Sequence, residues 1–265
     1  MSTTRASVNV LGVTVSRWTP EELVQAMVRS ARNAPADPGG APLRTVLYAN
    51  VHVLNTAYRT PELRRELEGA SCVYCDGVGV SMAGRFLAGS RLPRLTAADW
   101  LPLFCRSVAS AEIPIFLLGG APWVAEETAK RLRADHPRLQ ITGSHHGYLT
   151  EEDNRRLVAE INESGARILL VGMGTPRQEL WIKQHRASLD VPVVWAVGAL
   201  MDFVAGVQRR APRWMLRANL EWLWRLMTDP RRLAGRYLVG NPLFCLRVAR
   251  QRLSGPADKP EDVRD

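Results

Sequence analysis

The stretch RILLVGMGTPRQE, residues 167–179, decides the fold. Its first five residues are almost continuously apolar, which is typical of a strand buried on both faces of a parallel sheet. Gly172 and Gly174 then turn the chain, and a helical pattern follows over residues 176–188. A buried strand, a glycine turn and a helix in that order predict one unit of an open α/β sheet.

The same alternation extends over most of the chain. After a short β-like opening at residues 8–15, further strands are expected at 45–49, 71–75, 114–118, 139–142 and 191–196. Helices are expected at 61–69, 78–87, 99–110, 123–135 and 151–163. We therefore predict an α/β fold with a doubly wound, mostly parallel, Rossmann-like sheet. Residues 34–42 are expected to form a loop, and residues 254–265 a disordered tail.

The composition is that of a folded protein. The chain has 265 residues, of which 46% are hydrophobic and 23% charged, so disorder is excluded for most of it. Four cysteines without a paired spacing repeat, and the lack of an apolar secretory stretch near Met1, favour a cytoplasmic location. No transmembrane helix is expected, because the longest apolar stretch, residues 191–207, contains Pro192 and Asp202 and falls short of about 20 residues.

The positive charge is concentrated near the C-terminus. The net charge of the chain is +9, and residues 208–253 contain eleven arginines against Glu221 and Asp229. From residue 213 onward, three helical patterns, broken at 229–230 and at 240–242, mix these arginines with tryptophan and leucine. We therefore predict an α/β catalytic domain over residues 1–207 and a basic, helical, membrane-associating appendage over residues 208–253.

Ligands of open parallel sheets bind beyond the carboxyl ends of the strands. The residues that directly follow predicted strands and turn the chain there are Asn50, Asp76, Gly119, Gly120, Gly172 and Gly174. Because all of these strand ends lie along one edge of the sheet, we expect the residues to outline one cleft.

Each of these motifs also has a purely structural interpretation. Asp76-Gly77 is a common turn dipeptide, and on spacing alone a helix-capping aspartate is favoured over a general base. The Gly119-Gly120 pair suits a simple turn as well as a diphosphate at the next helix N-terminus. Residues 175–178 fit a capping box as well as a turn that binds a sugar or nucleotide.

Metal and redox sites are disfavoured. The sequence contains no His-Glu-x-x-His and no Asp-x-Asp pattern. Cys72 and Cys75 lie three residues apart in a predicted strand, where their side chains point to opposite faces. Arg177 stands where a dinucleotide fingerprint would have its third glycine. We therefore expect neither a metal nor a cofactor.

Taken in chain order, the motifs resemble the WecG/TagA/CpsF glycosyltransferase family, which is glycosyltransferase family twenty-six. The resemblance implies an inverting, metal-independent enzyme that moves a sugar from a UDP-sugar to a polyprenyl-diphosphate-linked sugar, in the assembly of cell-surface polysaccharide or a teichoic-acid-type polymer. Such an enzyme is a cytoplasmic protein bound peripherally to the anionic inner face of the plasma membrane. The resemblance rests on Asn50, residues 76–79, residues 94–96 with Asp99, Gly119-Gly120, residues 146–148, residues 172–179, Gly198, Asp202, Gly206, residues 210–212 and residues 221–226.

The resemblance also implies roles for single residues. Asp76 matches the family's proposed general base, and Gln178 matches a residue thought to orient substrate. Tyr48 and Ala97 stand where many members have threonine and glycine, so the identity of the sugar stays open. Substrate contacts are implied for Asn50, Arg94, Gly119, Gly120, Gly172, Gly174, Thr175, Glu179, Asp202, Arg225, Arg232 and Arg236, the last three on a diphosphate.

Two alternatives stay open at this point. Arginines interleaved with tryptophans also suit phosphate contacts and base stacking, so a basic α/β protein that binds nucleic acid is the second hypothesis. The resemblance argues against nucleic acid as a partner. The tryptophans are as well suited to packing against a second copy of the chain as against lipid, so a homo-oligomer also stays open.

Overall fold

The computed structural model describes residues 6–32 and 44–254, so the expected loop and all but the first residue of the expected tail lie outside the described residues. The strands form one sheet in the order β1-β2-β4-β3-β8-β7-β5-β6. β1 and β2 pair antiparallel at one edge, and the other neighbours pair in parallel. The strands are β1 (Ser7–Val10), β2 (Val13–Ser16), β3 (Thr45–Ala49), β4 (Cys72–Cys75), β5 (Ile115–Gly119), β6 (Ile141–His145), β7 (Ile168–Gly172) and β8 (Val193–Ala196).

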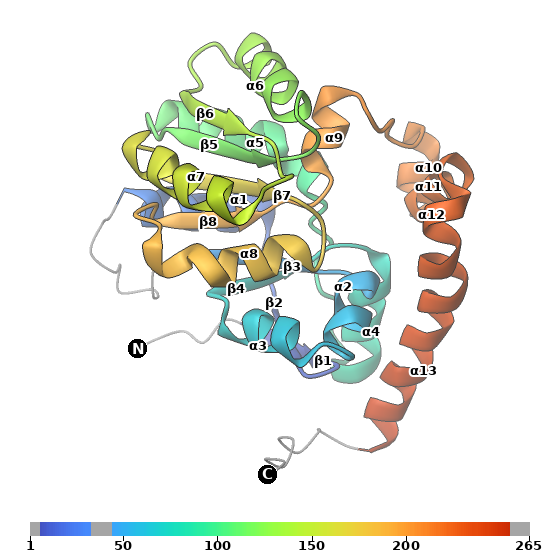
Figure 1. Ribbon diagram of the computed structural model, residues 1–265. Coiled ribbons are helices and arrows are strands. Elements are labelled where there is room, and N and C mark those ends of the chain that lie inside the picture. The colour runs from blue at the N-terminus through green and yellow to red at the C-terminus, as the bar shows by residue number, and fades with distance from the viewer. Residues whose placement is uncertain (1–5, 33–43, 255–265) are drawn as a thin grey trace.

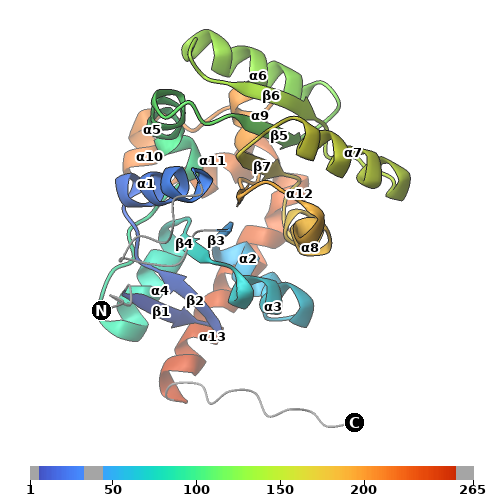
Figure 2. The same ribbon diagram turned by 90° about the vertical axis from the view of Figure 1, so that its left-hand side faces the viewer.

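Helices cover both faces of this sheet (Figures 1 and 2), so the predicted α/β fold is confirmed. Alternate residues of each strand point to opposite faces, and Cys75 and Cys72 accordingly belong to different cores, as predicted. One face carries α2 (Val51–Ala57), α3 (Pro61–Gly69), α4 (Val78–Ala88), α7 (Glu151–Glu163) and α8 (Arg177–His185). The other carries α1 (Pro20–Ala31), α5 (Ala97–Ser110), α6 (Val124–Asp135) and α9 (Leu200–Ala205).

Local capping explains two helices that lie outside the predicted set. α1 begins with a capping box, in which the hydroxyl of Thr19 accepts from the N–H of Glu22 and the Glu22 carboxylate accepts from the N–H of Thr19. α2 begins after Asn50, whose Oδ1 accepts from the N–H of Val53 at 3.0 Å. A third helix, α9, also lies outside the predicted set. It lies in a nearly continuous apolar run, which lacks the polar face that indicates an amphipathic helix.

The edge strand β6 is displaced from its predicted position. It spans residues 141–145 rather than 139–142. Gly143 explains the shift, because a Cβ atom there would lie only 2.3 Å from Cε2 of Phe116, so this residue fits directly beneath the phenyl ring. The polar sequence ITGSH gives no continuous apolar pattern, and the packing that fixes the strand is therefore not visible in the sequence.

The breaks between the C-terminal helices differ from the predicted ones. Residues 218–220 form a break that the pattern does not indicate, and the break expected at residues 240–242 is absent. α10 (Arg213–Arg217) and α11 (Glu221–Thr228) precede the expected break at Asp229. Residues 240–242 break nothing, since α12 (Pro230–Ala234), a π-helical turn (Gly235–Val239) and α13 (Gly240–Leu253) are continuous. The N–H of Gly240 donates to the carbonyl oxygen of Gly235, so the regular hydrogen-bond ladder is already interrupted where Pro242 follows.

α13 packs along the sheet domain (Figure 1). Phe244 and Val248 are buried in the same core as α2 and α4. In the middle of α13, Nη1 of Arg247 donates to Oδ1 of Asn55 on α2 at 2.8 Å. Near its end, Gln251 donates to a carbonyl oxygen of β1 at 2.9 Å. None of the described helices is long and apolar enough to cross a membrane.

Because Phe244 is part of the common core, Phe244→Ala is expected to lower the free energy of unfolding by about 3 kcal/mol. The matched control is Leu246→Ala on the same helix, which is 67% exposed and should change that free energy by less than about 0.5 kcal/mol. Urea denaturation followed by tryptophan fluorescence measures both. Equal effects, or a separate early transition for α13, would contradict the shared core.

Candidate active site

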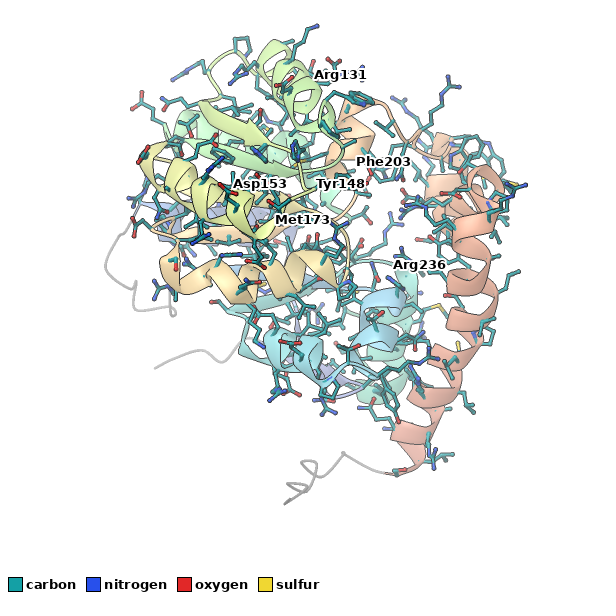
Figure 3. All side chains as sticks on the ribbon, viewed as in Figure 1. Arg131, Tyr148, Asp153, Met173, Phe203 and Arg236 are labelled. Carbon is teal, nitrogen blue, oxygen red and sulfur yellow. The ribbon has the colours of Figure 1, made fainter. Side chains whose placement is uncertain are left out.

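A cavity of about 2030 Å³ opens between the carboxyl edge of the strands and the C-terminal helices. It lies over β3 and β8, neighbouring strands whose following helices, α2 and α9, pack on opposite faces of the sheet. Open α/β sheets bind ligands where connections diverge in this way. Figure 3 labels four residues that border the cavity: Tyr148, Met173 and Phe203 on the sheet side and Arg236 on the C-terminal side.

Asp76 follows β4 and lines this cavity. The interpretation of Asp76 as a helix cap is wrong, because Gly77 is the N-cap residue of α4, with φ +102°, and no side chain caps that helix. Its carboxylate is instead held by Asn50. Oδ1 of Asn50 is engaged by the cap of α2, so Nδ2 donates to Oδ2 of Asp76 at 3.3 Å. The helix cap thereby orients the amide that binds the carboxylate.

The surroundings of Asp76 make it a better base than an exposed aspartate. Burial raises its pKa above the ordinary value, while hydrogen bonds from Asn50 and Thr96 and the charges of Arg225 and Arg236 partly offset that rise. A carboxylate with a raised pKa accepts a proton more readily and is suited to general-base chemistry near neutral pH.

Several arginines of the cavity wall form no ion pair within the described residues, and two of them lie close to Asp76. Arg225 of α11 and Arg236 of the π-turn form no ion pair within residues 6–32 and 44–254, whereas Arg232 pairs with Asp229. Nε of Arg225 is buried without a hydrogen-bond partner. Burial lowers the pKa of Arg236, and the charge of Arg225 lowers it further. Two neighbouring guanidinium groups that repel each other have the chemistry to bind a polyanion such as a diphosphate.

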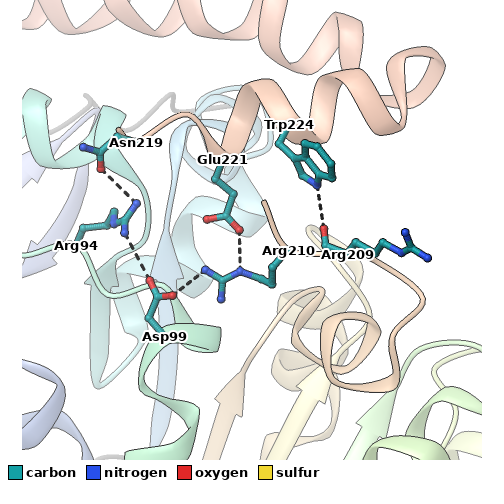
Figure 4. A network of polar contacts seen from close by, with 7 residues as sticks. All are labelled: Arg94, Asp99, Arg209, Arg210, Asn219, Glu221 and Trp224. Carbon is teal, nitrogen blue, oxygen red and sulfur yellow. Dashed lines mark hydrogen bonds and ion pairs between the residues drawn. The ribbon is translucent and has the colours of Figure 1, made fainter. Parts of the chain in front are cut away.

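A polar network anchors α10 and α11 to the sheet domain (Figure 4). Asp99, near the start of α5, accepts from Arg210 at 2.7 Å and lies 3.5 Å from Arg94. Nε of Arg210 also lies 3.2 Å from Oε1 of Glu221. Arg94 donates to Oδ1 of Asn219 at 3.3 Å. Arg94 also lines the cavity, but its guanidinium group already contacts Asp99 and Asn219.

Gln178 and Glu179 lie behind the cavity wall and are 0% and 1% exposed. The N–H of Gly198 donates to Oε1 of Gln178 at 3.0 Å, which leaves Nε2 to donate to the hydroxyl of Tyr48 at 3.1 Å and to Oε1 of Glu179 at 2.7 Å. The hydroxyl of Thr175 donates to the same Oε1 at 2.8 Å. Tyr48 and Thr175 line the cavity, so a ligand would meet this network through them.

The interpretation of residues 175–178 as a capping box is wrong. α8 has Pro176 at its N-cap, and no side chain caps it. The hydroxyl of Thr175 is used by Glu179 instead, and burial raises the pKa of Glu179. Burial likewise raises the pKa of Tyr48 to about 12, so its hydroxyl stays protonated over the physiological range.

The four glycines predicted at the site have two different roles: one allows close packing of strands, and three line the cavity. Gly119 does not line the cavity, and a Cβ atom there would lie 2.3 Å from the carbonyl oxygen of Gly172. Its role is therefore the close approach of β5 to β7. Gly120, Gly172 and Gly174 do line the cavity, where backbone without side chains allows a ligand to approach closely.

The structure brings together most of the residues named from the sequence. Gln178, Glu179 and Gly119 stand behind the wall, and all the others line it. His52 and Tyr237 also line the cavity. Burial and the charge of Arg236 lower the pKa of His52 to about 4, so it is neutral at pH 7. His52 could have been found from the sequence, because it lies at the start of a helix that directly follows the predicted strand β3. No sequence pattern indicates Tyr237, because its position in the cavity wall depends on the π-turn.

The fold and the site together define a class of protein. Within the described part of the chain, no three histidine, cysteine or acidic side chains gather as metal ligands do. A carboxylate, glycine turns and unpaired arginines surround one cleft at the edge of a parallel sheet, which is the arrangement of α/β enzymes that act on phosphate-bearing ligands. Residues 8–258 match the family model described as the Glycosyl transferase WecG/TagA/CpsF family. The chain belongs to this family, and the resemblance seen in the sequence is confirmed.

Because the carboxylate of Glu179 is buried, we expect a neutral side chain at this position to make the protein more stable, by an amount that depends on pH. Its Oε2 has no hydrogen-bond partner, so Glu179→Gln is expected to raise the free energy of unfolding at pH 7 by roughly 1 kcal/mol. Because the folded pKa is raised, wild-type stability falls as the pH rises through it. The gain should therefore shrink as the pH approaches the unfolded value of about 4.3. Urea denaturation from pH 4 to pH 8 measures it, and a constant difference would contradict the assignment.

Proposed function

We propose that this chain is an inverting, metal-independent glycosyltransferase that moves a sugar from a UDP-sugar donor to a polyprenyl-diphosphate-linked sugar, in the synthesis of cell-surface polysaccharide or a teichoic-acid-type polymer. The observation that carries the proposal is the position of Asp76 in one cavity with the unpaired guanidinium groups of Arg225 and Arg236. Membership of a glycosyltransferase family supports sugar transfer. The anion-binding arginines support substrates that carry diphosphates.

In this mechanism Asp76 is the general base. Its carboxylate takes the proton from the acceptor hydroxyl, and the freed oxygen attacks the anomeric carbon of the donor sugar from the face opposite UDP. The bond from that carbon to the UDP oxygen breaks, so the configuration inverts and UDP leaves with the electron pair. Asn50 keeps the carboxylate oriented through its 3.3 Å hydrogen bond, and positioning of this kind lowers the entropic part of the barrier.

The donor lies against the glycine turns in this proposal. Gly120, Gly172 and Gly174 border the cavity, and Asp202 also lines it. A side-chain-free rim permits hydrogen bonds from backbone N–H groups to phosphate oxygens. Gln178 acts through Tyr48, because its own side chain is buried.

Arg225 and Arg236 stabilise the departing UDP or bind the acceptor diphosphate. Negative charge grows on the UDP oxygen as the glycosidic bond breaks, and fixed cations in a partly dry site stabilise such charge without reorganising. Arg232 is paired with Asp229 in the free chain and can contribute once a polyanion competes for it. These cations supply the charge that a divalent metal supplies in other transferases.

The C-terminal helices provide the membrane contact in this proposal. Trp214, Leu238, Val239, Leu246 and Leu253 are each more than 60% exposed and alternate with arginines. A basic residue near an anionic leaflet contributes about 1 kcal/mol. We expect peripheral, salt-sensitive binding to the cytoplasmic face of the plasma membrane.

A donor screen tests the proposal directly. Purified protein given a polyprenyl-diphosphate-sugar analogue and EDTA is expected to release UDP from at least one UDP-sugar, with an inverted anomeric centre in the product. If turnover required a restored divalent cation, the metal-independent mechanism would be wrong. Absence of both UDP release and UDP binding would overturn the proposal, and retention of RNA or DNA in that case would favour the nucleic-acid hypothesis.

Asp76→Asn tests the base. The variant is expected to lose at least about a hundredfold in kcat and to bind UDP within about threefold of wild type, because the proton transfer occurs only in the transition state. Since the base must be ionised, wild-type kcat/KM should fall at low pH with an apparent pKa above that of an ordinary aspartate. Asp135→Asn, on the exposed side of α6, is the control. Unchanged turnover in Asp76→Asn would remove this residue from the mechanism.

A further inference from the structure

The cavity continues beyond the arginines as an apolar groove between α4 and α13. Met82 and Phe86 of α4 and Cys245 and Ala249 of α13 line it, above the buried Phe244 and Val248. The lining residues of α4 recur every four positions and those of α13 every three or four, so each helix gives one continuous face. We call this feature the α4–α13 groove.

The groove runs away from the site. α4 starts beside Asp76, and α13 starts beside the π-turn that carries Arg236. At the far end, Nη1 of Arg252 donates to the carbonyl oxygen of Leu87 at 3.1 Å, so the two helices end together and run in the same direction. The stretch from residue 78 to residue 86 spans about 12 Å. The groove is thus an extension of the cavity that ends where Arg252 contacts α4.

The side walls of the groove are unusually open for an apolar surface. Met82 and Phe86 are 57% and 54% exposed although both line the cavity. The base is firm by contrast, because Phe244 and Val248 belong to the core and Arg247 ties α13 to α2. Exposed apolar side chains on a firm base mark a preformed binding surface.

The position of the polar groups relative to the groove identifies the ligand class. Asp76, Arg225 and Arg236 lie together where α4 and α13 begin, and the apolar groove extends from there along the two helices. An extended peptide is disfavoured, because its N–H and C=O groups would find almost no polar side chain in the groove. A hydrocarbon chain that carries a diphosphate at one end matches both the arrangement and the polarity.

We infer that the α4–α13 groove binds the first part of the acceptor's polyprenyl chain, so that the protein itself, and not only the bilayer, recognises the hydrocarbon. The inference rests on the proposed function, since it takes the acceptor to be a lipid diphosphate. The diphosphate lies at Arg225 and Arg236, and the first isoprene units lie between Phe86 and Ala249.

Binding of two probes tests the groove without any turnover. Farnesyl diphosphate, below its micelle concentration, is expected to bind wild type at least about tenfold more tightly than inorganic diphosphate, because roughly two buried methylene groups suffice for that preference. Isothermal titration calorimetry in EDTA measures both affinities. Equal affinity for the two probes in wild type would overturn the inference.

Two variants on opposite walls change the groove by opposite means. Phe86→Gln makes it polar and Ala249→Phe fills it, and both are expected to bring the two probes within about threefold of each other while the affinity for inorganic diphosphate stays unchanged. Leu246→Gln is the matched control, because Leu246 lies on α13, is 67% exposed and does not line the cavity. It should keep the tenfold preference.

The outcomes separate the two proposals. Melting curves first establish that each variant is folded, and a defect in one leaves the other to decide. A preference that survives both Phe86→Gln and Ala249→Phe, or that disappears equally in Leu246→Gln, would place the hydrocarbon outside the groove. A farnesyl preference without UDP release from any donor would support the groove as a hydrocarbon site and contradict the proposed function. UDP release without the farnesyl preference would support the proposed function and contradict the groove.

Discussion

The candidate site depends on one partly buried carboxylate that lies beside positive charge. Burial alone would favour the neutral form of Asp76, and an unshielded pair of guanidinium groups would favour the anion. The two effects oppose each other here, and burial is the larger. The balance requires Arg225 and Arg236 to stay near the strand end, which explains why α11 and the π-turn are anchored to α5 and α2 rather than left free.

Backbone proximity sets the opposite wall. β5 and β7 approach so closely that Gly119 meets the backbone of Gly172, and the turns after both strands are drawn into one rim. Behind that rim, the amide of Gln178 connects β8 to β3 through Gly198 and Tyr48. A substitution in this hidden network therefore changes the shape of the cavity even though it touches no ligand. Tyr48 is where the network reaches the surface.

The apolar strands could be predicted from the sequence because a strand buried on both faces leaves a continuous run of hydrophobic residues. The edge strand β6 could not, since its place depends on Gly143 beneath Phe116. Strand ends indicated Asp76 and Asn50, but spacing favoured a cap for Asp76, and only the coordinates show Gly77 in that place. Charge counting located the basic segment. It could not tell which arginines line the cavity, because the direction of Arg236 is set by a π-turn that no residue pattern indicates, and that of Arg225 by the placement of α11.

One face of α13 packs in the core and the other is exposed, and this constrains how the chain can contact a membrane. Phe244 and Val248 are fixed in the core, so the helix cannot roll to bury Leu246 and Leu253 without opening the cavity. In the proposed membrane-bound state, the outward apolar side chains would therefore meet lipid in the orientation that the core imposes. In that orientation the groove lies on the inner side of α13, and Arg236 lies on the π-turn directly before this helix. A lipid that leaves the bilayer alongside α13 would thus reach the groove first and the carboxylate last, which is the order that transfer to its head group requires.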